Sequence, residues 1–365
     1  MSIKKKYIVL TLKWAEVSQY APSDRIRNAL KVSLKYAQEL GSEGRVGDVY
    51  YWVGRFAYMQ GDFNETLPQV ERCITWAKDL NNKELLAISY NLKGRSCLYT
   101  EEYKRGIEFL EKGLTLIKPF WKYDEIVYSG AFLGLIYGLT GQFDKSKKAI
   151  KNAIEVAKKH EILIFEAMAY GYLGTVNFLY GQWRDTINYC STCVDISKKL
   201  GNPLPTAWSS FFKGAAKFNL GEEERGLKLM RDGIQFLIAT DSVLALRYFY
   251  SLLAECLAIK GDIVEAESIN QKAMSLDQYG QKWGEIINYR TTALIHASET
   301  NPNWDCIDSN MKESILLAEK KEALPELVIS YSRYSKLLGQ KGDIERSESY
   351  RNKRQVLAEQ IGKKI

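Results

Sequence analysis

The stretch GLIYGLTGQFDKSKKAIKNA, residues 134–153, carries small side chains at fixed distances from a central turn. Gly134 lies seven residues before the turn at Gly141, Ser146 lies five residues after it, and Ala153 lies twelve residues after it. Glycine inside a helix costs about 1 kcal/mol relative to alanine. A glycine at the Gly134 position therefore indicates that a neighbouring helix passes very close to it.

The same arrangement recurs along the chain at a fixed spacing of about 40 residues, which is the signature of a helical repeat array. The turn position holds, in successive units, Gly61, Glu101, Gly141, Gly181, Gly221 and Gly261, and further turns follow at Asn301 and Gly342. The position seven residues earlier is also small and holds Gly54, Gly94, Gly134, Gly174, Gly214 and Ala254.

Apolar residues around each turn recur at helical spacing, so each unit is predicted to be two antiparallel helices of roughly 15 residues. We therefore expect an all-α fold, a right-handed superhelical solenoid of about nine antiparallel helix pairs. Residues 1–365 would form a single repeat domain, with turns near residues 21, 61, 101, 141, 181, 221, 261, 301 and 342. A polar cap is expected at about residues 343–362, where Ser347, Arg351 and Arg354 take the core positions.

The N-terminal helix, expected around residues 7–19, is less polar than a cap should be. Its apolar residues are Ile8, Leu10, Leu12 and Trp14. Two explanations stay open. These side chains pack on the next helix, or the chain is a piece of something longer.

Bulk composition narrows the classes of partner. The net charge is +7 and the pI is about 8.8, but Lys and Arg are scattered among Asp and Glu. Nucleic-acid-binding domains cluster their charge, so we expect no nucleic acid and only a weak preference for acidic groups on the partner. No apolar stretch approaches the ~18 residues of a membrane span, so no membrane partner is expected.

The six cysteines are not spaced as a disulfide framework, which favours a reducing compartment and a cytoplasmic location. Cys190 and Cys193 occupy core positions of their helix, so packing is favoured over a metal or redox pair. The two histidines, His160 and His296, are far apart in sequence. We therefore expect no catalytic residue, no metal and no cofactor.

The pattern of small residues resembles the tetratricopeptide repeat family, which has small residues at the same positions, although its usual period is shorter, at about 34 residues. The chain is more closely similar to the repeats of bacterial signalling ATPases, including those attached to class III nucleotide cyclases, which have the longer period seen here. That likeness lies in Leu252–Glu255, Gly261, Ala266, Ala273, Gly280–Glu285 and Arg290. The catalytic domains of those proteins lie elsewhere, and no phosphate-binding loop occurs here.

The resemblance implies that the first helix of each pair lines a concave groove that binds a partner. By register, the groove residues are Tyr51, Arg55, Tyr58, Asn91, Arg95, Tyr128, Phe178, Trp208, Phe211, Phe218 and Tyr248. Arg55 and Arg95 suit carboxylates or phosphate on a partner, unless they pair with Asp48 or another acid of the chain. The aromatic residues suit an apolar peptide or helix, unless they pack between repeats.

Two functions follow from the groove. The first is a non-catalytic interaction scaffold or sensor that binds a protein or peptide, within a signalling system. The alternative is a receptor for a small signalling peptide held inside the superhelix, as in peptide-pheromone receptors of Gram-positive bacteria. Those receptors usually carry an effector domain in front of the repeats, and nothing before Gly41 looks long enough for one. Such a receptor would clasp the peptide backbone with asparagines, here Asn91 and Asn177. A homo-oligomer stays open.

Overall fold

The computed structural model describes residues 2–18, 23–41, 45–201, 204–239 and 243–364. Eighteen α-helices and no strand occur within these residues, so the predicted all-α solenoid of about nine helix pairs is confirmed. In chain order the pairs are α1 (Ile3–Val17) and α2 (Asp24–Leu40), α3 (Val46–Gln60) and α4 (Phe63–Asp79), α5 (Lys83–Tyr99) and α6 (Tyr103–Ile117), α7 (Tyr123–Leu139) and α8 (Phe143–Lys159), α9 (Leu163–Leu179) and α10 (Trp183–Leu200), α11 (Leu204–Asn219) and α12 (Glu223–Ala239), α13 (Leu246–Lys260) and α14 (Ile263–Ser275), α15 (Glu285–Ala297) and α16 (Trp304–Lys320), and α17 (Leu324–Lys341) and α18 (Ile344–Ile361). Two 3-10 helices, η2 (Lys118–Phe120) and η3 (Leu276–Tyr279), extend α6 and α14.

The turn within a pair is a tight C-terminal cap of the first helix. At Gly141 the backbone has φ +85°, and the next amide, Gln142 N–H, donates back to Tyr137 O over 2.9 Å. Glycine adopts this left-handed conformation without a steric penalty. Glu101 occupies the same place with φ +57°, so the register is kept where glycine is missing. The turn expected near residue 21 lies outside the described residues, and the division into a single domain stays a prediction.

The small residues bring the two helices of a pair into close contact. A β-carbon at Gly134 would lie 2.9 Å from Ser146 O and would overlap Ile150 Cγ1. A β-carbon at Gly174 would lie 2.5 Å from the Cys190 sulfur. Cys190 and Cys193 are fully buried, and burial raises the pKa of the Cys193 thiol to about 11. The cysteine pair is therefore part of the packing between helices, as the repeat register indicates.

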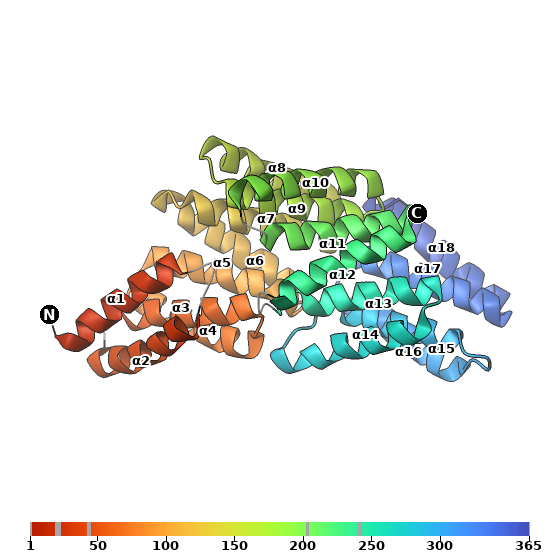
Figure 1. Ribbon diagram of the computed structural model, residues 1–365, viewed down its shortest axis with the longest axis horizontal. Coiled ribbons are helices and arrows are strands. Elements are labelled where there is room, and N and C mark those ends of the chain that lie inside the picture. Colours follow the sequence, from red (N-terminus) through yellow and green to blue (C-terminus); the bar gives the residue numbers. More distant parts are fainter. Residues whose placement is uncertain (1, 19–22, 42–44, 202–203, 240–242, 365) are drawn as a thin grey trace.

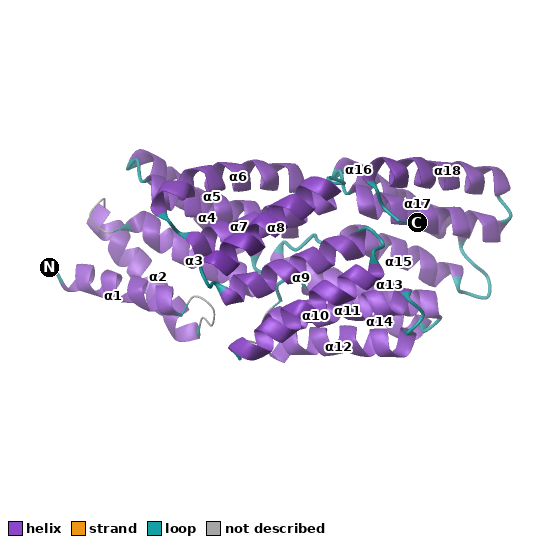
Figure 2. Ribbon diagram, turned by 90° about the horizontal axis from the view of Figure 1, so that it is seen from above, coloured by secondary structure: helices purple, strands orange, loops and turns teal. Residues whose placement is uncertain are grey.

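The chain arches so that its two halves meet. In Figure 1, α1–α4 lie at the left end, α7–α11 run along the top and α15–α18 lie at the right end. Below the arch, the start of α4 contacts η3, where the Asn64 side-chain amide donates to Gln278 O over 2.9 Å. Figure 2 shows the same elements from above, joined mostly by short loops. The solenoid therefore closes on itself through contacts between its early and late repeats.

The two terminal helices differ. On α18 the outward face is polar, Arg351 is exposed, and Ser347 is buried against α17. On α1, Ile8 and Leu12 are buried, whereas Leu10 is 67% exposed and Trp14 is 41% exposed. Only half of the apolar residues singled out on the N-terminal helix thus pack on their neighbours.

Candidate functional site

The predicted groove residues are packed rather than open to solvent. Ten of the eleven are buried, and Trp208 is half-buried. The alternative weighed for the aromatic residues, packing between repeats, agrees with this burial. A role of these residues in partner binding stays a prediction.

Arg95 on α5 is the centre of a buried polar cluster. Its Nη1 donates to Ser129 Oγ over 2.6 Å and forms an ion pair with Glu125, both on α7. The guanidinium lies 4.6 Å from the centre of the Tyr128 ring, and the Tyr128 hydroxyl lies 3.5 Å from that of Tyr58. Arg95 is fully buried, and its Nε and Nη2 have no hydrogen-bond partner among the described residues. The guanidinium therefore keeps free donor capacity inside the arch.

The neighbouring arginine contributes to the field around this cluster. Arg55 on α3 is 6% exposed, and its Nη1 donates to the Tyr51 hydroxyl over 3.4 Å. Burial opposes the charge on Arg95, but Glu125 and nearby tyrosines outweigh burial, so the pKa of Arg95 is raised. Burial also opposes the charge on Arg55, but Tyr51, Glu125 and Tyr128 together outweigh burial, so the pKa of Arg55 is raised and both guanidiniums stay charged. The sequence left open that the arginines pair with Asp48 or another acid of the chain. For Arg95 this alternative is confirmed, and the acid is Glu125.

The two asparagines are buried, and their role in clasping a peptide backbone stays a prediction. The Asn91 amide packs against Gly113 of α6, where a β-carbon would overlap Asn91 Oδ1. The Asn177 side chain donates to Leu173 O of its own helix over 2.7 Å. Helical register alone does not reveal that Asn91 lies towards the second helix of its pair.

The aromatic residues of the middle and last repeats form a cage around a tryptophan that we did not predict as a site residue. Trp283 stacks on Tyr248 with ring centres 4.1 Å apart and on Trp208 at 5.6 Å, and it meets the Tyr99 ring edge-on at 5.8 Å. Trp283 is 2% exposed. Its flanking glycines, Gly280 and Gly284, were the sequence signal that could have marked it. We call Tyr99, Trp208 and Tyr248 the aromatic cage.

Trp283 belongs to the crossing segment, which we define as residues 276–284. The backbone amides of Lys282 and Trp283 both donate to Tyr99 O, over 2.7 and 3.0 Å. The Gln281 side chain donates to Gly61 O over 3.2 Å and to Val243 O over 2.9 Å. These contacts join α3 and α5 to the segment between α14 and α15.

Charged residues reinforce the crossing. Glu101 is buried, forms an ion pair with Lys321 and accepts a hydrogen bond from the Gly284 amide over 3.3 Å. Lys321 also pairs with Glu285 over 2.8 Å. Burial raises the pKa of the Glu101 carboxyl, and Lys321 opposes this rise.

The C-terminal residues form a second contact with the inside of the arch. The Lys364 amide donates to Tyr180 O over 3.0 Å, and the Lys363 ammonium donates to Leu179 O. Burial lowers the pKa of Lys363 to about 8. Both contacts use carbonyls at the C-terminal end of α9, which its own helix leaves unpaired.

A third buried cluster holds the last repeats together. Arg290 forms a bidentate pair with Glu255, with both contacts at 2.8 Å, and pairs with Glu326 over 3.0 Å. Arg333 also contacts Glu255 over 3.1 Å. Burial opposes the charge on Glu255, but the two arginines outweigh burial and hold its pKa at about 2.

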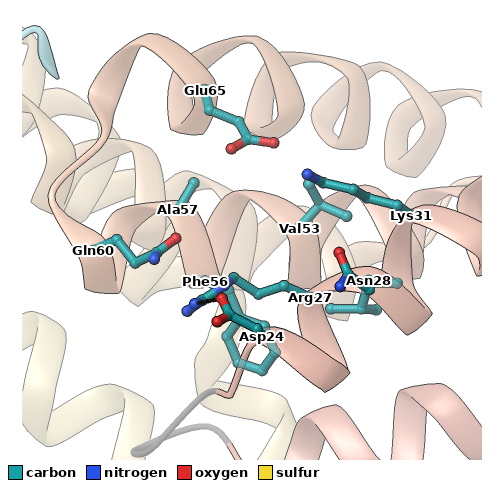
Figure 3. A pocket seen from close by; sticks show the side chains of 10 residues that line it. Asp24, Arg27, Asn28, Lys31, Val53, Phe56, Ala57, Gln60 and Glu65 are labelled. Atoms are coloured by element: carbon teal, nitrogen blue, oxygen red, sulfur yellow. Dashed lines mark hydrogen bonds and ion pairs between the residues drawn. The ribbon is translucent and has the colours of Figure 1, made fainter. Parts of the chain in front are cut away.

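Other polar features are less suited to a binding site. A pocket of about 140 Å³ lies between α2, α3 and α4, and its lining includes Asp24, Arg27, Lys31 and Glu65 (Figure 3). It is small, and Arg27 forms an ion pair with Asp24. His160 stacks on Tyr123 at 3.5 Å, and His296 contacts Glu299.

The described residues lack both a candidate metal site and a helix able to cross a membrane. They contain no group of three or more His, Cys, Asp or Glu side chains that could hold a metal ion. None of the described helices is both long and apolar enough to cross a membrane.

Comparisons with known proteins agree on the fold. The sequence profile of the tetratricopeptide repeat matches residues 131–160. No curated protein sequence matches the chain. A crystal structure of a Rap protein complexed with competence and sporulation factor is similar at a TM-score of 0.74 and 9% identity, over 98% of this chain and 99% of that one.

Two further structures are similar. The Rap conjugation gene regulator of the plasmid pLS20 in complex with the Phr* peptide matches at a TM-score of 0.62 and 15% identity, over 94% of this chain and 97% of that one. Aspartyl phosphate phosphatase F from Bacillus subtilis matches at 0.55 and 16% identity, over 98% of this chain and 94% of that one. At these identities the likeness shows the fold alone, so the chain is a helical-repeat protein with a tetratricopeptide-like fold.

Proposed function

We propose that the chain is a non-catalytic sensor of the cytoplasm that binds a peptide, or a peptide segment of a protein, inside the arch. The observation that carries this proposal is the fully buried Arg95 guanidinium, whose Nε and Nη2 lack partners among the described residues. A carboxylate matches the fork of a guanidinium and forms charge-assisted hydrogen bonds with it. The bound peptide would therefore offer an acidic side chain or its C-terminal carboxylate.

The comparisons support a peptide as the ligand. Two of the similar structures contain, by their titles, a signalling factor or a peptide. Both are matched over nearly the whole of each chain, so the fold in which those proteins bind their ligands is present here over its full length. One similar protein is named a phosphatase. We propose no such activity for this chain, because the buried charged side chains of this chain form ion pairs between repeats.

Binding of short peptides tests the proposal. Fluorescein-labelled peptides of five to eight residues, with and without Asp, Glu or a free C-terminal carboxylate, would be titrated by fluorescence polarisation. We expect an acidic subset to bind, and the double variant Arg95→Met with Glu125→Gln to weaken that binding at least ten-fold. Removing both partners avoids leaving a buried Glu125 unpaired.

The matched control is Arg231→Met, which removes a surface arginine that pairs with Glu265 away from the interior. This control should bind as the wild type does. Binding that persists in the Arg95 and Glu125 double variant, in a protein with unchanged circular dichroism, would contradict the proposal.

A second candidate function rests on α1. Ile3, Leu10 and Val17 are spaced seven residues apart on this helix and are 86%, 67% and 80% exposed. Residues 1–40 also contain eight Lys and Arg but only three Asp and Glu. This excess of positive side chains accounts for most of the net charge of +7 of the whole chain. Such an apolar stripe on a basic end favours docking of a folded acidic partner or of a second copy.

Light scattering separates self-association from the peptide function. We expect a monomer whose mass is independent of concentration if α1 serves another protein. A dimer that is lost in Leu10→Ser with Val17→Ser would instead assign the stripe to a second copy. Neither result bears on Arg95, which lies inside the arch.

A further inference from the structure

The crossing segment departs from the repeat geometry. The second helices α4 and α8 have 17 residues each, whereas α14 has 13, and α15 also has 13 where α9 has 17. The nine residues between them include η3 and then leave the helical path at Gly280, with φ +72°, before α15 begins after Gly284, with φ +110°. Only the ends of this segment share hydrogen bonds with the flanking helices, since the Leu276 amide donates to α14 and Gly284 O accepts from Asn288 of α15. The residues between these ends lie outside both helices, as connecting segments do.

The carbonyl oxygens that accept hydrogen bonds from the crossing segment could equally accept them from the backbone of a bound peptide. Gly61 O and Tyr99 O lie at the C-terminal ends of α3 and α5, where the last carbonyls of a helix have no partner within it. The segment supplies backbone amides to Tyr99 O and one side-chain amide to Gly61 O. Any extended peptide carries such amides, so these acceptors do not depend on the identity of the bound chain.

Specificity comes from the aromatic cage. Tyr99, Trp208 and Tyr248 come from three different repeats, and each of the three rings contacts Trp283. The Trp208 indole nitrogen donates to Thr175 Oγ1 over 2.8 Å, which fixes the ring plane. Large planar rings from several elements make a site that selects an aromatic side chain.

We propose that the aromatic cage is a binding site for an aromatic residue of a peptide ligand, and that Trp283 of the chain itself occupies it in this structure. The proposal rests on the proposed function and names the chemistry of its ligand. That ligand is an extended peptide with an aromatic side chain for the cage and an acidic group for Arg95.

The cage and the arginine cluster are continuous. The Tyr99 ring contacts the Tyr58 ring at 5.9 Å, and the Tyr58 hydroxyl reaches the Tyr128 hydroxyl beneath Arg95. A peptide that displaces the crossing segment would therefore run from the cage towards Arg95. Displacement would also break the hydrogen bond from the Gly284 amide to Glu101, which gives binding a means to change the shape of the arch.

The chain's own segment provides the probe for this site. The acetylated and amidated peptide YGQKWGE, residues 279–285, would carry a fluorescent label and be titrated into the full-length protein. We expect the Trp283→Ala variant to bind it with a Kd in the micromolar range, and the wild type to bind at least ten-fold more weakly because its cage is occupied. The same peptide with alanine for tryptophan should not bind the variant.

The matched control is Trp121→Ala, a tryptophan that is 72% exposed. It should behave as the wild type. Equal binding of the probe by the wild type and Trp283→Ala, or equal binding of the alanine peptide, would overturn the proposal.

A second variant tests the same proposal in case Trp283→Ala does not fold. Asn64→Ala with Gln281→Ala removes three side-chain hydrogen bonds that hold the segment, to Gln278 O, Gly61 O and Val243 O, while leaving every ring of the cage in place. It should bind the probe at least three-fold more tightly than the wild type, and unchanged binding would overturn the proposal. The only acidic group of this probe that could bind Arg95 is the glutamate at its C-terminal end. Failure here would therefore leave the acidic-peptide titrations, which test the proposed function, unaffected.

Discussion

The regular repeats α7–α10 and the crossing segment both depend on glycine, but glycine has a different structural role in each. In α7 and α8, Gly134 lets Ile150 approach, and the most extensive contacts are made between neighbouring helices. In the crossing segment, Gly280 and Gly284 let the backbone leave the helical path and reach Tyr99, which belongs to a much earlier repeat of the chain. Glycine thus makes close packing possible in the first region and long-range closure possible in the second.

The difference teaches where regulation can act. A regular repeat gains its stability from adjacent helices, so it changes little when the arch opens. The crossing segment gains its stability only while the two halves of the chain are together. Four experiments measure how much each region contributes to stability.

The largest effect is expected at Trp283. Trp283→Ala removes a buried indole from between three rings, and we expect a loss of about 3–5 kcal/mol in the free energy of unfolding. Thermal unfolding followed by circular dichroism measures this loss. The exposed Trp121→Ala should change stability by less than about 0.5 kcal/mol. Equal effects of both variants would mean that the crossing contributes nothing to stability.

The next effect concerns the buried carboxylate of α13. The Arg290 and Arg333 guanidiniums outweigh burial and hold the pKa of Glu255 at about 2, below its ordinary value of 4.5. The lowered pKa stabilises the fold above pH 4.5, and this stabilisation is lost as the pH falls towards 2. Glu255→Gln should therefore cost about 3 kcal/mol at pH 7 and progressively less from pH 4.5 to pH 2. A difference that is independent of pH would contradict this assignment.

The regular repeats can be tested with two glycines of one helix. A β-carbon at Gly134 would lie 2.9 Å from a backbone oxygen, whereas one at Gly130 would meet only Ala153 at 3.8 Å. Gly134→Ala should therefore destabilise by about 1–3 kcal/mol. Gly130→Ala should stabilise by about 0.5–1 kcal/mol through helix propensity. Urea unfolding compares the two, and destabilisation by both would argue against a special role of the repeat position.

The smallest effect is expected at the C-terminal contact. Burial lowers the pKa of Lys363 to about 8 from 10.5, so its charge disfavours the folded state below pH 8. This penalty falls as the pH rises from 8 to 10.5, and stability should rise with it. Lys363→Met should raise stability by about 1–2 kcal/mol at pH 7, since it removes the buried charge at the loss of one hydrogen bond to Leu179. A variant less stable than the wild type at pH 7 would show that the hydrogen bond outweighs burial.

The regular part of the fold follows from local pattern. The column that includes Gly134 and the turn at Gly141 repeat with one fixed period, so helix pairs, their turns and their closest contacts can be predicted from spacing. The polar face of α18 follows from Arg351 and its neighbours in the same way. In these cases the deciding contact lies within one repeat.

The site was harder to predict because it depends on closure of the arch. Residues such as Tyr58 and Tyr128 were predicted to line the groove from their register, but their burial depends on contacts between repeats, which spacing does not specify. Trp283 was missed because its partners lie in other repeats and its segment follows no helical register. Asn91 packs towards Gly113, a contact that its register in α5 does not specify.

Hydrogen–deuterium exchange at the amides of Lys282 and Trp283 tests the closed arch most directly. Both amides donate to Tyr99 O across the interior, so closure predicts exchange as slow as in the middle of α7, although neither amide belongs to a helix. The variant Asn64→Ala with Gln281→Ala should speed exchange at these two amides and leave α7 unchanged. Exchange in the wild type as fast as in the free peptide YGQKWGE would contradict the closed arch and the occupied cage together.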